Sequence, residues 1–442
     1  MDLFSQFIRN IKDRYLFTKN DRLLLAVSGG IDSVVLTALC RKAGFDFAIA
    51  HCNFQLRGAA SDADESFVKT LADQFEIPCF GIRFNTKDFA LENKLSTQEA
   101  ARELRYRWFE DIRKVEGFDY ILTAHHANDN VETVLMNFFR GTGINGLTGI
   151  KEKNGAIIRP LLFAKRKELE DFLEKEGLAF VQDESNLKND YTRNFIRNAM
   201  FPQMAAIYPE VENNLIANIG RFKEVDRLYG EAINRHKKKL ALQKGAEIHI
   251  PVLLLQRSVA PSTILFEVIK GYGFGAGQLP EVQCLLESES GHYVSSETHR
   301  VIRDRKHLVL APLQPAEKTR IVIDGAGRYD FDGGHLMIRT AAYEGGKIPQ
   351  ELDRAWLDAK EIHFPLILRP WKTGDYFYPL GMEKKKKVSR FLIDTKRSLT
   401  EKENTWVVEM NKKIIWIVGQ RIDNRFRITG HTKNIMEISC NE

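Results

Sequence analysis

The first 140 residues alternate between short apolar stretches typical of strands and longer amphipathic stretches typical of helices. This alternation limits the fold more than any other feature, because strands separated by helices form parallel sheets with helices on both faces. The expected strands cover residues 22–27, 45–51, 79–84 and 119–124, and the expected helices cover residues 33–43, 61–75, 96–114 and 128–139. We therefore predict an α/β fold with a doubly wound parallel sheet. Ligands of such sheets bind beyond the carboxyl ends of the strands, so residues 28–33, 51–57 and 125–132 are expected to face a ligand.

The pattern changes after residue 208, and we take residues 1–208 as the N-terminal domain. Residues 210–243 read as one long helix, and 261–271 and 279–287 read as two shorter ones. We therefore predict a mostly helical middle domain over residues 209–312, with short strands near its end at residues 292–311. Residues 312–315 carry two prolines and suggest a linker. Strand-like stretches at residues 320–323, 335–340, 366–369 and 414–418 predict a small α+β C-terminal domain over residues 319–442.

The charge balance is mildly basic. The 442 residues include 65 Lys and Arg against 59 Asp and Glu, a net charge of +6, which suits a phosphate-rich partner without requiring one. The cysteines are Cys40, Cys52, Cys79, Cys284 and Cys440. They form no C-x-x-C pair, so reduced thiols are favoured over a disulfide or metal framework. No secretory pattern and no apolar run of about 18 residues is present, so we expect a cytoplasmic protein.

A glycine turn separates the first expected strand from its helix. It consists of Ser28, Gly29, Gly30, Ile31, Asp32 and Ser33. Phosphate suits this place, because the first N–H groups of the helix and its dipole point at one spot. The turn lacks the P-loop lysine that supports γ-phosphoryl transfer, and Asp32 can hold a divalent cation. These features favour pyrophosphate as a leaving group, and the strand–turn–helix context disfavours the alternative of a tight turn without a ligand.

A second polar cluster follows the fourth expected strand. Asp129 and Glu132 lie three residues apart on a helix, so their carboxylates share one face, and carboxylates close together suit Mg²⁺. Asp129 and Asn128 could instead cap the helix. His125 and His126 end the strand, but no third ligand nearby supports zinc.

Three sets of basic residues could contact nucleotide or RNA. Arg102 and Arg105 share one helix face, as do Arg193 and Arg197, and paired arginines suit phosphate or carboxylate recognition. Surface salt bridges are the alternative for these arginines, and for Arg140. A basic run in the tail comprises Lys384, Lys385, Lys386 and Lys387. With Trp371, Tyr376 and Tyr378 close by in sequence, that run could grip RNA, although solvated lysines are the alternative.

The glycine turn resembles the signature of the PP-loop, or N-type, ATP pyrophosphatases. Enzymes of this family use ATP to adenylate a carbonyl or carboxylate oxygen, release pyrophosphate, and let a nucleophile displace AMP. The resemblance implies that ATP is bound by Ser28, Gly29, Gly30, Ile31, Asp32, Ser33, His51, Arg102, Arg105 and His125. It also implies catalytic roles for Asp32, Asp129 and Glu132. Asp32 and Asp129 would hold Mg²⁺, and Glu132 is our candidate for the proton acceptor.

Other motifs resemble the tRNA(Ile)-lysidine synthetase family within that superfamily. The family's A-R-x-x-R-Y, A-H-H-x-x-D-x-x-E-T, R-G-x-G-x-x-G-L and D-x-S-N…R-N-x-x-R patterns match residues 101–106, 124–133, 140–147 and 183–197. The segment around residues 369–381 resembles its C-terminal module. Three positions depart from the family pattern: Phe54 and Tyr376 replace a histidine and an arginine, and Asn128 stands where aspartate is frequent.

The resemblance implies a specific reaction. ATP would adenylate the ring carbonyl oxygen beside N3 of the wobble cytidine in isoleucine tRNA with a CAU anticodon, and the ε-amine of free lysine would displace AMP. ATP and Mg²⁺ are the implied cofactors, and the middle domain and tail would contact tRNA. The candidate tRNA or phosphate contacts are Arg140, Arg193 and Arg197 of the N-terminal domain and Lys384 to Lys387 of the tail. Relatives are often dimers, so a homodimer is compatible with the resemblance.

Three alternatives remain open. A thiolating tRNA enzyme acting on cytidine would need cysteine pairs, and a synthetase that amidates a small molecule would need an ammonia source. A non-catalytic tRNA-binding protein with a vestigial nucleotide site is disfavoured because Asp32 and Asp129 are retained.

Overall fold

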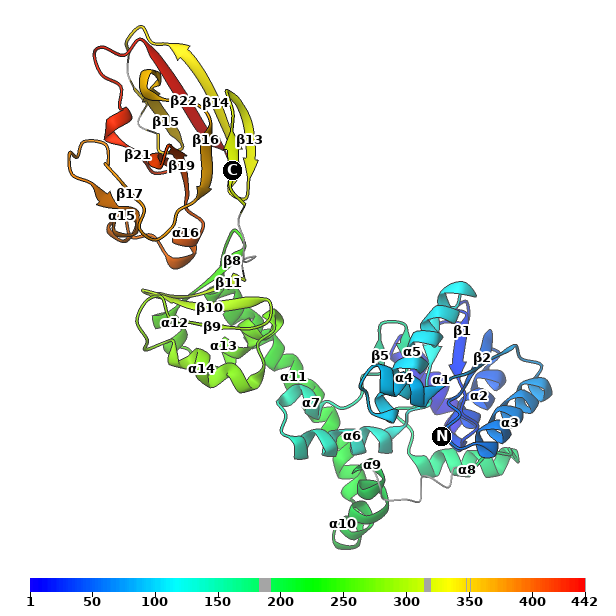
Figure 1. The fold of residues 1–442 in the computed structure, drawn as a ribbon. Helices are drawn as coiled ribbons and strands as arrows, with labels where there is room; N and C mark the ends of the chain where they lie inside the picture. The colour runs from blue at the N-terminus through cyan, green and yellow to red at the C-terminus, as the bar shows by residue number, and fades with distance from the viewer. Residues whose placement is uncertain (183–191, 314–318, 347, 350, 442) are drawn as a thin grey trace. The chain divides into compact units, whose positions relative to one another are not determined.

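The computed structural model describes residues 1–182, 192–313, 319–346, 348–349 and 351–441 (Figure 1). The chain divides into two compact units, Met1–Glu231 and Ala232–Glu442. The D-x-S-N motif at residues 183–186 and the end of the expected linker, residues 314–315, lie outside the described residues. In the described part of the chain, no helix combines the length and apolar composition needed to cross a membrane.

The first unit is built on a six-stranded sheet in the order β3-β2-β1-β4-β6-β5. The strands are β1 (Leu23–Ala26), β2 (Phe47–Asn53), β3 (Cys79–Arg83), β4 (Tyr120–Leu122), β5 (Lys153–Asn154) and β6 (Ile157–Ile158). Neighbours from β3 to β6 pair in parallel, and β5 pairs antiparallel at one edge. The predicted parallel sheet is confirmed, with an added antiparallel edge strand.

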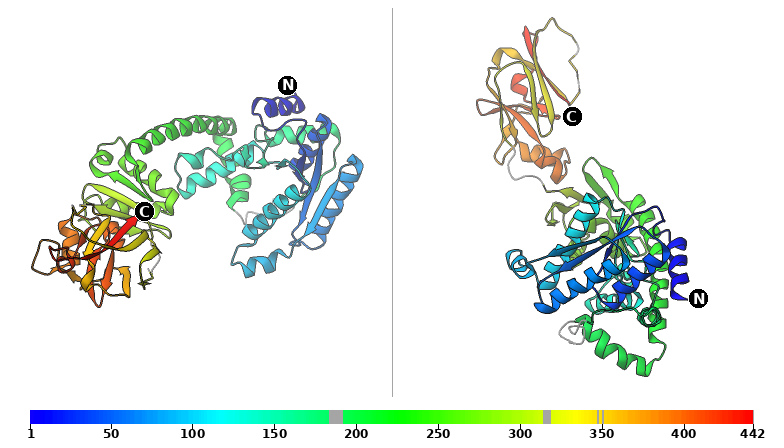
Figure 2. Two further views of the ribbon diagram at one scale, coloured as in Figure 1. Left: turned by 90° about the horizontal axis from the view of Figure 1, so that it is seen from above. Right: turned by 90° about the vertical axis from the view of Figure 1, so that its right-hand side faces the viewer.

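Helices cover both faces of this sheet, as predicted (Figures 1 and 2). One face carries α1 (Leu3–Asp13), α2 (Ile31–Ala43), α3 (Ala59–Phe75) and α8 (Arg166–Glu176), and the other carries α5 (Thr97–Val115), which follows α4 (Thr86–Glu92). Strand β1 serves both cores, because side chains alternate along a strand. Leu23 and Leu25 belong to the first core and Leu24 to the second.

The order of the strands creates a crevice next to β1. The strands β2 and β3 lie on one side of β1, whereas β4 pairs with its other edge. The carboxyl ends of β1 and β4 are therefore adjacent, at the switch point where ligands bind in such folds. Helix α2 begins soon after β1, and α6 (Ala127–Arg140) begins soon after β4.

A run of helices completes the first unit. It comprises α7 (Ile144–Leu147), α9 (Thr192–Phe195), a π-helical turn (Ile196–Met200), α10 (Phe201–Ile207) and α11 (Val211–Leu240), whose last residues belong to the second unit. Val131 and Val134 of α6 pack against Ile219 of α11. The π-helical turn contains Arg197, and turns of this kind are frequent at functional sites.

The middle of the chain is not helical alone, which corrects in part our prediction of a mostly helical domain over residues 209–312. After α11 it forms a five-stranded antiparallel sheet, β7-β8-β11-β10-β9. Its elements are β7 (Leu242–Lys244), β8 (Glu247–Pro251), α12 (Val252–Gln256), α13 (Pro261–Ile269), α14 (Leu279–Cys284), β9 (Tyr293–Ser295), β10 (His299–Asp304) and β11 (His307–Pro312). The missed signal was the alternation in β8, where Ile248 and Ile250 are buried between half-buried neighbours, preceded by Gly245 at φ +57° in the hairpin turn.

The C-terminal part consists of two larger antiparallel sheets around one core, with orders β12-β16-β19-β20-β21 and β13-β14-β22-β15. Their strands are β12 (Ile321–Ile323), β13 (Gly327–Phe331), β14 (Gly334–Ala342), β15 (Arg354–Asp358), β16 (Leu366–Pro370), β19 (Trp406–Met410), β20 (Lys413–Ile417), β21 (Arg421–Ile422) and β22 (Asn434–Asn441). Ile338, Leu366, Trp406 and Trp416 lie in the shared core. A small hairpin, β17 (Tyr376–Phe377) with β18 (Lys386–Lys387), and helices α15 (Val388–Asp394) and α16 (Leu399–Glu403) complete this part.

Candidate functional site

Glycine and serine contacts shape the turn after β1. Gly29 has φ of +92°, a left-handed conformation that side chains rarely adopt. The Ser33 hydroxyl accepts from the Ser28 N–H at 3.2 Å and donates to the Gly30 carbonyl at 2.9 Å. Helix α2 then begins without a side-chain cap. The N–H groups of its first turn are therefore available to an anion.

A cavity of about 670 Å³ opens at the carboxyl ends of β1 and β4. Ten of the predicted site residues line it: Ser28, Gly30, Ile31, Asp32, Ser33, Arg105, His125, Asp129, Arg193 and Arg197. Gly29, His51, Arg102, Glu132 and Arg140 are not among its lining residues in the part of the chain that the structure describes. Pockets of this size hold nucleotide-sized ligands.

Asp32 lies at the centre of this cavity's charged wall. Its Oδ2 is 3.7 Å from His126 Nε2 and 3.6 Å from an Arg166 guanidinium nitrogen. Its Oδ1 is buried and has no hydrogen-bond partner among the described residues. Burial raises the pKa of Asp32, although the charges of His126 and Arg166 oppose that rise. A buried oxygen without a donor is suited to a cation that comes with the ligand.

Asp129 both caps a helix and faces the cavity. Its Oδ2 accepts from the backbone N–H of His126 at 3.0 Å, which closes a capping box on α6, so the capping alternative from the sequence is observed. Burial would raise its pKa, but His126 and Arg197 outweigh burial and the pKa is lowered. The carboxylate is therefore anionic at neutral pH.

Glu132 forms a nearly buried centre for ion pairs with Arg193 and Arg197, whose side chains are partly exposed. Arg197 Nε lies 2.6 Å from Glu132 Oε1, and its Nη2 lies 3.0 Å from Oε2 and 3.3 Å from Asp129 Oδ1. Arg193 Nε lies 3.3 Å from Glu132 Oε2, and its Nη2 donates to Thr133 Oγ1 at 2.9 Å. The Glu132 side chain is only 6% exposed. Burial raises the pKa of Glu132, while the hydrogen bonds from Arg197 act in the opposite direction.

The two predicted histidines are both neutral at physiological pH. Burial lowers the pKa of His125 to about 4, and its Nδ1 is 3.0 Å from Thr123 Oγ1. Burial likewise lowers the pKa of His51, whose Nδ1 donates to the Val27 carbonyl at 2.9 Å. His125 lines the cavity and can exchange hydrogen bonds with a ligand without carrying charge.

The arginines of α5 point at aromatic rings. The Arg105 guanidinium lies 5.1 Å from the Phe54 ring centroid, and Phe54 stacks on Phe84 at 5.8 Å. Arg102 lies 4.9 Å from the Tyr106 ring. Phe54, where the family pattern has histidine, therefore lines the cavity as an apolar surface under Arg105.

Sequence reasoning missed several residues of the cavity, above all Arg166 at the start of α8. Its backbone N–H donates to Asn128 Oδ1 at 3.0 Å, so the Asn128 amide oxygen is engaged between α6 and α8. The signal was the helix start, where the Glu168 carboxylate accepts from the backbone N–H of Lys165 at 2.8 Å. The start of α8 could be predicted from the sequence, but the position of its first turn at the cavity wall could not.

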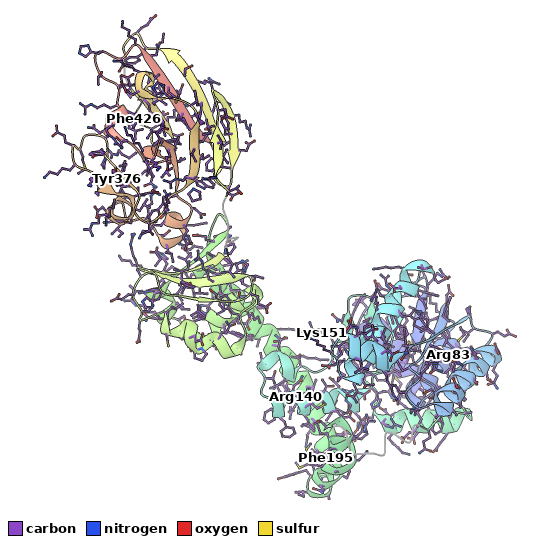
Figure 3. The ribbon with its side chains drawn as sticks, in the orientation of Figure 1. Arg83, Arg140, Lys151, Phe195, Tyr376 and Phe426 are labelled. Carbon is purple, nitrogen blue, oxygen red and sulfur yellow. The ribbon has the colours of Figure 1, made fainter. Side chains whose placement is uncertain are left out.

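The remaining basic residues lie outside the cavity. Arg140 is the exposed last residue of α6 (Figure 3). Lys384 to Lys387 belong to the second unit, where Lys386 Nζ pairs with Asp394 at 2.8 Å. Trp371, predicted as an RNA-stacking residue, packs instead against the core and donates its Nε1–H to the Lys402 carbonyl at 2.6 Å.

The carboxylates fit a cation that brings its own ligands. No three His, Cys, Asp or Glu side chains cluster as a complete metal site in the residues described. Asp32 and Asp129 supply hard oxygens, one of them without a donor, and Mg²⁺ is usually held by one or two carboxylates plus phosphates and water.

Comparison with known proteins covers nearly the whole chain. Family models match as PP-loop domain over residues 3–204, TilS substrate binding domain over 243–313 and TilS substrate C-terminal domain over 366–440. A tRNA(Ile)-lysidine synthase from Bacteroides thetaiotaomicron is 39% identical over 433 residues, and one from Parabacteroides distasonis is 38% identical over 435 residues, each match covering 98% of both chains. Among solved structures, the U34-tRNA thiolase NcsA from Methanococcus maripaludis aligns with 16% identity and a TM-score of 0.42, covering 50% of this chain and 79% of that chain.

Proposed function

The chain belongs to the tRNA(Ile)-lysidine synthase family, and on that premise we propose that it joins free L-lysine to the wobble cytidine of isoleucine tRNA, using ATP. One observation carries the proposal from the geometry. A single cavity unites a glycine turn without a P-loop lysine, the carboxylates of Asp32 and Asp129, and the guanidinium groups of Arg193 and Arg197.

The turn and α2 would bind the phosphates of ATP. In the first step, the cytosine carbonyl oxygen beside N3 attacks the α-phosphorus, and the bond to pyrophosphate breaks. N–H groups at the start of α2 and the Ser33 hydroxyl lie where the leaving pyrophosphate needs hydrogen bonds. The Arg166 guanidinium, 3.6 Å from the Asp32 carboxylate, adds a positive charge to the same wall of the cavity.

In the second step, the ε-amine of lysine attacks the activated ring carbon and AMP leaves. The new carbon–nitrogen bond replaces the carbon–oxygen bond. The amine must be uncharged to attack, so lysine first gives an ammonium proton to solvent, and the proton that the nitrogen loses on forming the bond also passes to solvent.

Mg²⁺ would be held by Asp32 and Asp129, and it would neutralise charge on the phosphates. The unpartnered Asp32 Oδ1 supports this assignment.

We propose a different role for Glu132 from the proton acceptor expected at first. Its two oxygens engage Arg197 and Arg193. Glu132 is thus a positioning residue that holds both guanidinium groups at the cavity, where they can meet nucleotide phosphates.

The thiolating alternative is disfavoured by the cysteines. Cys52 lines the cavity, but burial raises its pKa to about 12. A thiol of this kind is protonated at neutral pH and is a poor nucleophile.

Several further assignments rest on the same premise. We propose three functional regions: residues 1–208 for activation, and 209–312 and 319–442 for tRNA contact, which the three family matches support. A cytoplasmic location and a homodimer remain part of the proposal.

The decisive experiment supplies the protein with ATP, Mg²⁺, labelled lysine and two transcripts with CAU anticodons, one for isoleucine and one for methionine. We expect label on the isoleucine transcript alone, with AMP and pyrophosphate released. An unlabelled isoleucine transcript would refute the reaction, and equal labelling of both would refute the specificity. Release of pyrophosphate without lysine transfer would favour another adenylating tRNA enzyme.

A further inference from the structure

Four side chains on the surface of the C-terminal part form a ladder of alternating cations and rings. Lys385 Nζ lies 5.4 Å from the Tyr376 ring centroid, the Tyr376 and Tyr378 rings lie edge to face at 6.5 Å, and the Arg425 guanidinium lies 4.5 Å from the Tyr378 centroid. We call these four residues the Tyr376 ladder. Tyr376 sits on the small β17–β18 hairpin and is 47% exposed (Figure 3), so much of its ring is open to a partner.

A buried carboxylate holds the ladder in place. Asp423, fully buried, accepts from Arg425 Nε and Nη2 and from the backbone N–H of Tyr378, each at 2.9 Å. The backbone N–H of Asn424 donates to the Tyr378 carbonyl at 2.6 Å, and its side chain accepts from the Gly381 N–H at 3.0 Å. Tyr378 and Arg425, the inner half of the ladder, are therefore ordered without a ligand, which reduces the entropy lost on binding.

The surface around Tyr376 is positively charged. Lys386 is paired with Asp394, but Lys384, Lys385 and Lys387 are exposed and make no ion pair within the described residues. The acidic residue Glu383 directly precedes the lysine run. Excess lysines beside an open ring match a ligand that combines a flat face with phosphates.

We propose that the Tyr376 ladder binds an unpaired nucleotide of the tRNA, with its base stacked on Tyr376 and its phosphates against Lys385 and Lys387. Paired bases inside a duplex have no free face to offer, so stacking selects an unpaired base. This inference rests on the proposed function, because it takes tRNA as the ligand. It also explains the departure at Tyr376: a ring replaces the charge of the usual arginine, and contact by stacking replaces contact by charge.

The test compares two RNA hairpins with the same stem, each closed by a non-nucleotide linker so that no loop base is unpaired. One hairpin is blunt and the other has a single-stranded 3′ extension, and binding to the full-length protein is measured. We expect Tyr376→Leu to weaken binding of the extended hairpin about tenfold, or about 1.4 kcal/mol, which lies within the range for stacking of one base. Binding of the blunt hairpin should change less than about twofold. Tyr376→Phe keeps the ring and should keep the affinity.

A control is available in Tyr15, an exposed ring (89%) in residues 1–208, outside the regions assigned to tRNA contact. Tyr15→Leu should leave both hairpins unaffected. Lys385→Ala with Lys387→Ala should weaken both hairpins and lower the salt dependence of binding, by a slope of about 0.7 per lost phosphate contact.

Equal losses for the two hairpins with Tyr376→Leu would overturn the proposal, and so would no loss. If Tyr376→Leu weakened binding of polyglutamate more than binding of either RNA, the surface would be assigned to an acidic protein instead. These measurements need neither ATP nor lysine, so they are separate from the labelling experiment. If lysine transfer fails while the extended hairpin binds as expected, the reaction is wrong and the ladder stands.

Discussion

Glu132 shows at the scale of one residue how a buried carboxylate can act through its partners. Replacing it with alanine takes the carboxylate from Arg193 and removes the shorter of the ion pairs of Arg197, which keeps its 3.3 Å contact with Asp129 and is 28% exposed. We expect Glu132→Ala to lower the free energy of unfolding by about 2–3 kcal/mol, the cost of leaving charged hydrogen-bonding groups unpaired. Denaturant unfolding measures this loss. The KM for ATP should rise as well, because the arginines are no longer held at the cavity.

Asp171 provides the control for this change. It pairs with Lys167 on the surface, with side-chain exposures of 58% and 72%, so Asp171→Ala should cost less than about 1 kcal/mol and leave ATP binding intact. A Glu132→Gln variant whose KM for ATP is normal, but whose rate loses its dependence on pH, would contradict the positioning role and restore Glu132 as the proton acceptor.

Alanine variants at Gly29 and Gly44 distinguish the effect of backbone strain from the effect of ligand contact. Both have left-handed φ, +92° and +66°, so alanine at either should cost about 1–2 kcal/mol. An added Cβ at Gly29 would lie 3.3 Å from Phe67 and 3.4 Å from Val181, whereas one at Gly44 meets nothing within 4 Å. We expect only Gly29→Ala to weaken ATP binding, by about tenfold or more, measured by calorimetry. Equal ATP affinity in the two variants would show that the turn does not hold the phosphates.

The residues of the site could be predicted from the sequence as far as local spacing reaches. Three-residue spacing places Asp129 and Glu132 on one face of α6, and the glycine turn marks the start of α2. The partners of Glu132 could not be read in this way, because Arg193 and Arg197 lie more than sixty residues further along the chain. Their pairing depends on how α6 and the π-helical turn pack.

At the scale of elements, Asn128 links three helices. On α6, its Oδ1 accepts from the Arg166 N–H of α8, and its Nδ2 donates to Glu212 Oε1 of α11 at 3.2 Å. This second contact gives a physical reason for asparagine where the family often has aspartate. An aspartate would place one carboxylate beside another.

We therefore expect Asn128→Asp to lower the free energy of unfolding by about 1–2 kcal/mol, through a lost hydrogen bond and charge repulsion. Combining it with Glu212→Gln should recover most of that loss, since an amide can again donate across the contact. A double-mutant cycle measured by urea unfolding gives the coupling. A coupling near zero would leave the asparagine unexplained by α11.

Helices and strands were easiest to predict where one pattern of alternating strands and helices repeats along the chain. The βα alternation of the first unit repeats often enough to indicate the sheet, whereas β7 and β8 are three and five residues long and directly follow a 30-residue helix. Short strands gain their stability from cross-strand pairing. Strand β8 pairs with β7 in a short hairpin and, on its other edge, with β11, nearly sixty residues away. That pairing is not visible in local sequence.

At the scale of the whole molecule, the two compact units have separate cores. We expect two transitions in scanning calorimetry, one for each unit. ATP with Mg²⁺ at about 100 times its Kd should stabilise the first unit by about 2.7 kcal/mol and raise its Tm by several degrees, because the cavity lies wholly within Met1–Glu231. The Tm of the second unit should not move.

Two variants assign the transitions. Asp129→Asn should abolish the shift caused by ATP and Mg²⁺. Arg369→Ala should lower only the second transition, because Asp375 and Glu409, 8% and 12% exposed, lose their shared guanidinium partner; removing one member of a buried pair costs about 3–5 kcal/mol. A single transition that ATP and Arg369→Ala both move would show that α11, which continues across the division, couples the two units into one cooperative structure.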